Sequence, residues 1–215
     1  TGGLMKLKIT KTILFEIIMG LGILAILINM ASIVIKNSGG EGDKKSGLTY
    51  NEIYALPKRP TQLQKDLYIE LSEQLKADTD DVLPKVNLVV KNFIADYYTW
   101  TNKGGSYDVG GLTYIVSHSY LTLMESSRLG FYRDLDAFAN KYGKDQLLEV
   151  ETITGTADYA RPFTFLGEDF NAFYMEVEWT YVDRDEFPEH EFQTKAAFIV
   201  IDFNGVLQIA QFLEI

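Results

Sequence analysis

The sequence predicts an α+β fold, in which helices pack on a curved antiparallel sheet, preceded by one transmembrane helix. Three observations lead to this prediction. Residues 13–35 form a single apolar run, apolar residues recur at helical spacing between residues 61 and 142, and apolar and polar residues alternate from residue 147 onward. Helices followed by strands with short connections are typical of a sheet that is covered on one face.

The apolar run predicts a membrane anchor over residues 12–35. As a helix, residues 13–35 would reach about 34 Å, enough to cross a hydrocarbon core of roughly 30 Å. A cleaved signal peptide is the alternative, but its apolar region would be shorter and would end in a small-x-small site. The sequence Met-Ala-Ser at 30–32 matches such a site poorly, so we expect an uncleaved signal anchor.

Charges on the two sides of the run predict its orientation. Three lysines precede the run, whereas only Lys36 follows it closely, and the side richer in Lys and Arg stays in the cytoplasm. Residues 1–11 are therefore expected in the cytoplasm. Residues 36–60 are expected to form a flexible tether, because they begin with a stretch rich in Gly, Ser and charge. Residues 61–215 are expected to fold as one domain on the outer side of the cell membrane.

The composition excludes some partners and kinds of chemistry. The formal net charge is −10, and a chain this acidic repels nucleic acid. It contains no cysteine, no HExxH motif and no phosphate-binding glycine loop. We therefore predict no nucleic acid partner, no cofactor, no metal and no catalytic residue, and the chain is not expected to be an enzyme.

Helices are predicted after the tether, each with a start or a stop signal. Thr61 and Gln64 have the spacing of a capping box. An aspartate at 80 or 81 can cap the next helix, which has Pro84 in its first turn, and Gly143 is a typical glycine at a helix end. The predicted helices cover residues 61–75, 82–102 and 126–142.

Strands are predicted from residue 147 onward, because apolar and polar residues alternate there. In the first of them, four residues are expected on one face: Leu148, Val150, Thr152 and Thr154. Asn204-Gly205 lies between the last two strands and predicts a tight hairpin, since both of its residues tolerate positive φ. The predicted strands cover residues 147–154, 170–181, 192–203 and 206–215.

The order of elements resembles a known fold. A long helix ending in tyrosines (VVKNFIADYYTW), a second helical region and long strands with a final Asn-Gly hairpin resemble the nuclear transport factor 2-like, or cystatin-like, cone. With its anchor, the chain is similar to the membrane-anchored assembly factors of type IV secretion and conjugation machines. The resemblance implies a homo-oligomer that contacts the membrane and other membrane-complex subunits, and it implies no site residues.

Within the predicted anchor, Glu16 is an unusual residue because a charge inside an apolar helix is costly. It either reaches water near the cytoplasmic end or pairs with another helix. A type IV pilin also carries Glu at the fifth position of its mature helix, but Lys11 then occupies the required glycine site. Small and polar residues on the anchor allow close helix packing: Gly20, Gly22, Ala25 and Asn29.

An acidic loop is predicted at residues 183–191, between two strands. Its side chains are potential calcium ligands, but they lack the spacing of an EF-hand, and a solvated hairpin tip is the simpler interpretation: Asp183, Asp185, Glu186, Glu189, His190 and Glu191. His118 lies between Ser117 and Ser119, but without a GxSxG motif it does not indicate a catalytic triad.

The preferred interpretation is therefore a single-pass structural or assembly subunit of a multiprotein envelope machine, similar to secretion or conjugation machines. A pilin-like filament subunit, or an accessory subunit of another membrane complex, is the alternative. A third possibility is an enzyme or ligand binder that uses the mouth of the cone, with four candidate residues: Asp96, Tyr97, Tyr98 and Asp202.

Overall fold

The computed structural model describes residues 51–77, 79–159 and 162–215, which belong to one compact unit. These residues form helices and an antiparallel sheet, which confirms the predicted α+β fold. The predicted anchor and residues 36–50 of the predicted tether lie outside the described residues. The remaining tether residues, 51–60, pack on the domain: Tyr54 is buried, and its hydroxyl donates to Leu207 O over 2.6 Å. Within the described ranges, no helix is both long enough and apolar enough to cross a membrane.

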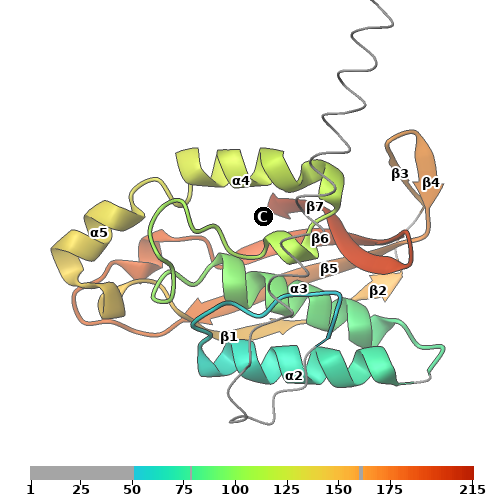
Figure 1. Ribbon diagram of the computed structural model, residues 1–215, viewed down its shortest axis with the longest axis horizontal. Helices are drawn as coiled ribbons and strands as arrows, with labels where there is room; N and C mark the ends of the chain where they lie inside the picture. Colours follow the sequence, from blue (N-terminus) through green and yellow to red (C-terminus); the bar gives the residue numbers. More distant parts are fainter. Residues whose placement is uncertain (1–50, 78, 160–161) are drawn as a thin grey trace, which may run out of the picture. The chain divides into compact units, whose positions relative to one another are not determined.

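The main sheet is antiparallel and has the strand order β1-β5-β6-β7, with β2 also paired to β5. The hairpin of β3 and β4 forms a separate small sheet that projects beyond the main one (Figure 1). The strands are β1 Val150–Gly155, β2 Asp158–Tyr159, β3 Phe163–Phe165, β4 Glu168–Phe170, β5 Ala172–Tyr181, β6 Lys195–Phe203 and β7 Val206–Glu214.

Helix α3 lies between α2 and the sheet (Figure 1) and contacts both of them. Because it is covered on two sides, α3 is buried over most of its length. The α-helices are α2 Gln62–Lys76, α3 Leu83–Tyr97, α4 Tyr120–Leu129 and α5 Leu135–Tyr142. Short 3₁₀ helices lie at Leu112–Tyr114, Ser117–Ser119, Lys144–Gln146 and Glu189–Glu191.

The start of α2 is confirmed, and at α3 one of the two predicted aspartates binds an N–H group of the first turn although it is not the assigned capping residue. At α2, Gln64 N donates to Thr61 Oγ1 over 3.3 Å, and Thr61 N donates to Gln64 Oε1 over 2.8 Å. At α3, the capping residue is Val82, without a side-chain hydrogen bond. Asp81 instead accepts a hydrogen bond from the first helical residue, Leu83 N, over 3.1 Å, while Pro84 lies in the first turn as predicted.

The single helix predicted at residues 126–142 is wrong, because the chain forms two helices there. Gly130 ends α4 with φ −114° and ψ −105°, which no helix can contain. The chain then turns before α5 begins at Leu135. Gly143 ends α5 with φ +90°, which confirms the predicted stop signal.

The strand pattern is confirmed in β5 and corrected in β1. In β5, buried and exposed side chains alternate from Phe173 to Tyr181. In β1, Val150 faces Tyr181 and Thr152 faces Thr180, so the register shifts by one residue at a bulge. The bulge turns Thr152 and Thr154 to the solvent face, and the predicted common face with Val150 is therefore wrong.

The two tight hairpins differ in how well the sequence predicted them. Asn204 and Gly205 have φ of 57° and 82° and join β6 to β7, which confirms the prediction. Leu166 and Gly167 join β3 to β4 with φ of 54° and 85°. A leucine with positive φ is uncommon, and three-residue strands are too short for an alternation to show.

Candidate functional site

The predicted acidic loop is held in place by buried aromatic side chains. Phe187 is buried and stacks on Phe192, with ring centroids 5.6 Å apart. Glu189 is half-buried, and the other predicted side chains are exposed: Asp183, Asp185, Glu186, His190 and Glu191. Among the described residues, no group of three His, Asp or Glu side chains could hold a metal ion. Apolar packing therefore fixes this loop, which the sequence predicted to be a solvated tip.

The residues predicted to contact other helices in the membrane lie outside the described residues. Their role in helix association stays a prediction. They are Glu16, Gly20, Gly22, Ala25 and Asn29.

The four candidates for a cone-mouth site do not come together. The Tyr97 and Ser127 hydroxyls hydrogen-bond over 2.8 Å, and the Tyr98 hydroxyl donates to Gln193 Oε1 over 3.0 Å. Both tyrosines are buried among other aromatic rings. Asp202 lies at the β6–β7 hairpin, where it accepts a hydrogen bond from Gly205 N. Asp96 lines the polar pocket described below.

Helix α4 carries apolar side chains that the domain does not bury. Its only buried residue is Ser127, while Leu121 is 64 % exposed and Leu129 is 76 % exposed. The end of β7 lies beside α4 in Figure 1 and carries further exposed apolar side chains. Leu213 follows Phe212, which pairs with the core residue Phe198, so Leu213 points to the opposite face of the sheet. We therefore give the name α4–β7 surface to the groove between α4 and β7 together with the exposed apolar residues of α4: Tyr120, Leu121 and Leu129.

A groove of about 210 Å³ runs between α4 and β7. Its lining is uncharged and combines apolar side chains such as Leu123 and Phe212 with the hydroxyl groups of Ser and Thr residues on α4. β7 is the last strand of the sheet, and Val116 N donates to its Ile209 O over 3.1 Å. Past Ile209, no described strand pairs with the outer edge of β7. Such an edge can bind another polypeptide.

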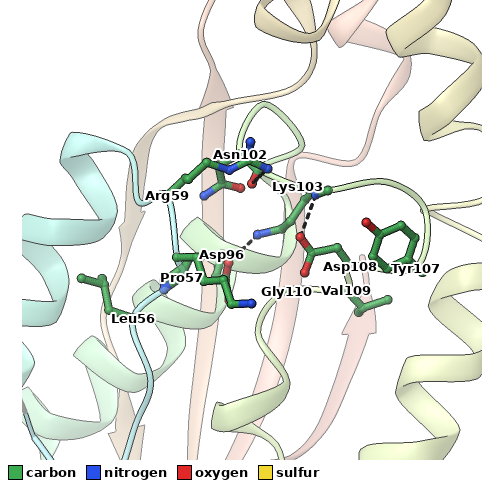
Figure 2. Close-up of a pocket in the computed structure, with 12 residues that line it drawn as sticks. Leu56, Pro57, Arg59, Asp96, Asn102, Lys103, Tyr107, Asp108, Val109 and Gly110 are labelled. Atoms are coloured by element: carbon green, nitrogen blue, oxygen red, sulfur yellow. Dashed lines mark hydrogen bonds and ion pairs between the residues drawn. The ribbon is translucent and has the colours of Figure 1, made fainter. Parts of the chain in front are cut away.

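A second, polar pocket of about 630 Å³ lies at the C-terminal end of α3. Figure 2 shows that its walls come from the segment before α2, residues 56–59, and from the loop at residues 102–110. Inside it, Lys103 Nζ contacts Asp96 Oδ1 over 2.5 Å. The Lys103 side chain is only 4 % exposed, so this is a buried ion pair.

The same carboxylate fixes the loop that follows. Asp96 Oδ2 accepts a hydrogen bond from Gly111 N over 2.7 Å. Gly110 lies so close to α3 that a Cβ atom would be 2.3 Å from the Asp96 carbonyl oxygen, and Gly111 has φ +74°. Both glycines are therefore required for the close approach of this loop to the helix end.

Buried hydroxyl groups surround this end of α3. The Tyr132 hydroxyl donates to Tyr97 O over 2.5 Å and accepts from Gly110 N over 3.0 Å. Burial, followed by the nearby Asp96 charge, raises the pKa of Tyr132 and of Tyr114 well above its usual value of 10.0. Burial also raises the pKa of Tyr97. These phenols are therefore neutral over the physiological range.

Comparisons of the chain with protein-family models, curated proteins and solved structures find no match.

Sequence reasoning missed both the exposed helix and the buried lysine. The apolar residues of α4 are typical of a packed helix, and nothing in their spacing indicates that Leu121 and Leu129 stay exposed. Lys103 follows α3 in a polar Asn-Lys-Gly-Gly segment, which is typical of a solvated loop. Its partner Asp96 lies on the preceding helix, and no local pattern links the two.

Proposed function

We propose that the chain is a single-pass membrane protein whose extracytoplasmic domain is a structural or assembly subunit of a multiprotein envelope machine. In this proposal residues 12–35 form the anchor, with the N-terminus in the cytoplasm. The machine is of a secretion or conjugation kind, as the order of elements suggests. The observation that carries the proposal is the α4–β7 surface, because it is suited to bind a second protein.

The exposure of α4 is energetically unusual. Isolated helices shorter than about 12–15 residues are marginal in water, and α4 has 10 residues. Most helices gain their stability by packing an apolar face. α4 packs Leu123 and Met124 against the core but leaves Leu121 and Leu129 in water. Burying each of these side chains against a partner would contribute roughly 1.5–3 kcal/mol. A partner subunit that covers α4 therefore stabilises both the helix and the complex.

Native electrophoresis of membranes solubilised in mild detergent tests this proposal. We expect the chain, of 24.4 kDa, to migrate in a species several times larger. The variant Leu121→Ser/Leu129→Ser should shift it to a smaller species without lowering the thermal stability of the domain. The matched control is Glu70→Ser/Glu73→Ser on the exposed face of α2, which should leave the large species intact.

Two results would contradict the proposal. One is a wild-type chain that migrates at the size of a monomer in every mild detergent. The other is a double-leucine variant that keeps the large species unchanged.

A further inference from the structure

The pocket at the end of α3 contains cationic groups that lack carboxylate partners. Lys58 and Arg59 line the pocket, and in the described part of the chain neither forms an ion pair. Arg59 Nη2 donates to Asn102 O over 3.2 Å, and Figure 2 shows the two residues beside each other at the pocket wall. This contact places the guanidinium group and leaves most of its five N–H donors available.

Lys103 adds a third cation deep in the pocket. An ammonium group has three N–H donors, and the acceptor found for Lys103 within the described residues is Asp96 Oδ1. Buried polar groups in proteins are nearly always satisfied, by protein atoms or by other molecules. An acceptor that enters the pocket would therefore complete the hydrogen bonding of this ammonium group.

The carboxylates of the pocket already accept hydrogen bonds from groups of the protein. Asp96 uses one oxygen for Lys103 and the other for Gly111 N. Asp108 Oδ2 accepts a hydrogen bond from Gly104 N over 2.7 Å. Three cations thus face two carboxylates, and three of the four carboxylate oxygens accept these internal hydrogen bonds. This local excess of positive charge lies in a chain with a formal net charge of −10.

We propose that this pocket binds a small organic anion that carries a carboxylate or phosphate group. Its volume of about 630 Å³ is within the usual range of small-molecule pockets, roughly 300–1,000 Å³. Arg59 and Lys103 can each donate charge-assisted hydrogen bonds to an oxyanion. Leu56 and Val109 provide apolar contacts to the carbon skeleton of the ligand. This binding does not depend on the proposed assembly function.

Calorimetric titration of the full chain in detergent micelles tests the proposal. The probes are citrate for carboxylates and glycerol phosphate for phosphates, with glycerol as the neutral control. We expect at least one anionic probe to bind in the millimolar range or tighter, and its affinity to fall as salt is added. The exposed variant Lys58→Gln/Arg59→Gln should raise Kd about tenfold or more.

A second variant with the same change in charge distinguishes binding in the pocket from a general effect of the protein's net charge. Lys76→Gln/Arg128→Gln removes two exposed cations outside the pocket and should leave Kd unchanged. The probe that binds more tightly identifies the anionic group of the ligand class. Binding of neither anion, equal binding of glycerol, or equal loss of affinity in both double variants would overturn the proposal.

Discussion

Helices α3 and α4 are both rich in apolar residues, but the domain uses them differently. α3 is enclosed by α2 and the sheet, and Val89, Phe93 and Ile94 have no exposed surface. α4 buries only Ser127 and exposes two leucines. The comparison teaches that apolar content alone does not show which helix builds the core. Apolar residues that a domain leaves exposed on a regular helix are available for a partner.

High pH should cause the largest loss of stability, because it acts on the buried tyrosine hydroxyls around the C-terminal end of α3. The pKa values of Tyr97 and Tyr132 are raised by burial, so the folded state holds these protons more tightly than the unfolded state does. Their contribution to stability is complete below the usual pKa of 10.0 and is lost as pH rises above it. We expect the free energy of unfolding, measured with denaturant, to fall steeply above about pH 10. A flat profile from pH 8 to 11 would contradict the burial of these hydroxyls.

The ion pair at the end of α3 should give the next largest effect. Asp96→Asn leaves the Lys103 ammonium buried without its counter-ion, and breaking a buried pair typically costs about 3–5 kcal/mol. Denaturant unfolding of the variant should show this loss, and Asp96→Asn/Lys103→Gln should recover part of it. A loss of unfolding free energy smaller than about 1 kcal/mol would instead indicate that the ion pair is exposed to solvent.

Matched leucine substitutions compare the two helices directly. Leu88 on α3 is 4 % exposed, and Leu129 on α4 is 76 % exposed. Leu88→Ala should destabilise the domain by about 2–5 kcal/mol, since it leaves a cavity in the core. Leu129→Ala should change stability by less than about 0.5 kcal/mol. Similar losses in both variants, measured by thermal unfolding, would show that α4 is part of the core.

The hydrogen bond between the two helices should have a smaller effect than the core substitution Leu88→Ala. Ser127→Ala removes the partner of the Tyr97 hydroxyl, which lies 2.8 Å from Ser127 Oγ. Leaving one buried hydroxyl unpaired costs about 1–3 kcal/mol. Because α4 has few other buried contacts, amide hydrogen exchange should also become faster in α4 while α3 stays protected. Equal acceleration in both helices would contradict a separate attachment of α4.

The sequence predicted the elements whose signals are local. The capping box of Thr61, the alternation in β5 and the Asn204-Gly205 turn each depend on residues that are close in the chain, and the structure confirms all three. The break at Gly130 was missed because a single glycine is tolerated inside many helices. The bulge in β1 was missed because it depends on pairing with β5.

The candidate sites were harder to predict, because they depend on contacts between distant segments. The polar pocket combines residues 56–59 with residues 102–110, and no spacing within either segment indicates the other. The exposure of Leu121 and Leu129 depends on where α4 lies against the sheet, and helical periodicity does not contain that information. The acidic loop was located correctly, but the buried Phe187 within it was not recognised as a core residue.

Site-specific photo-crosslinking in intact membranes tests the central claim most directly. A photoreactive residue is placed at Leu121 or Leu129 on α4, and at Glu73 on the exposed face of α2 as the control. We expect discrete crosslinked products from both α4 positions and none from Glu73. Crosslinks from Glu73 alone, or none from either α4 position, would contradict the role of α4 in binding a partner.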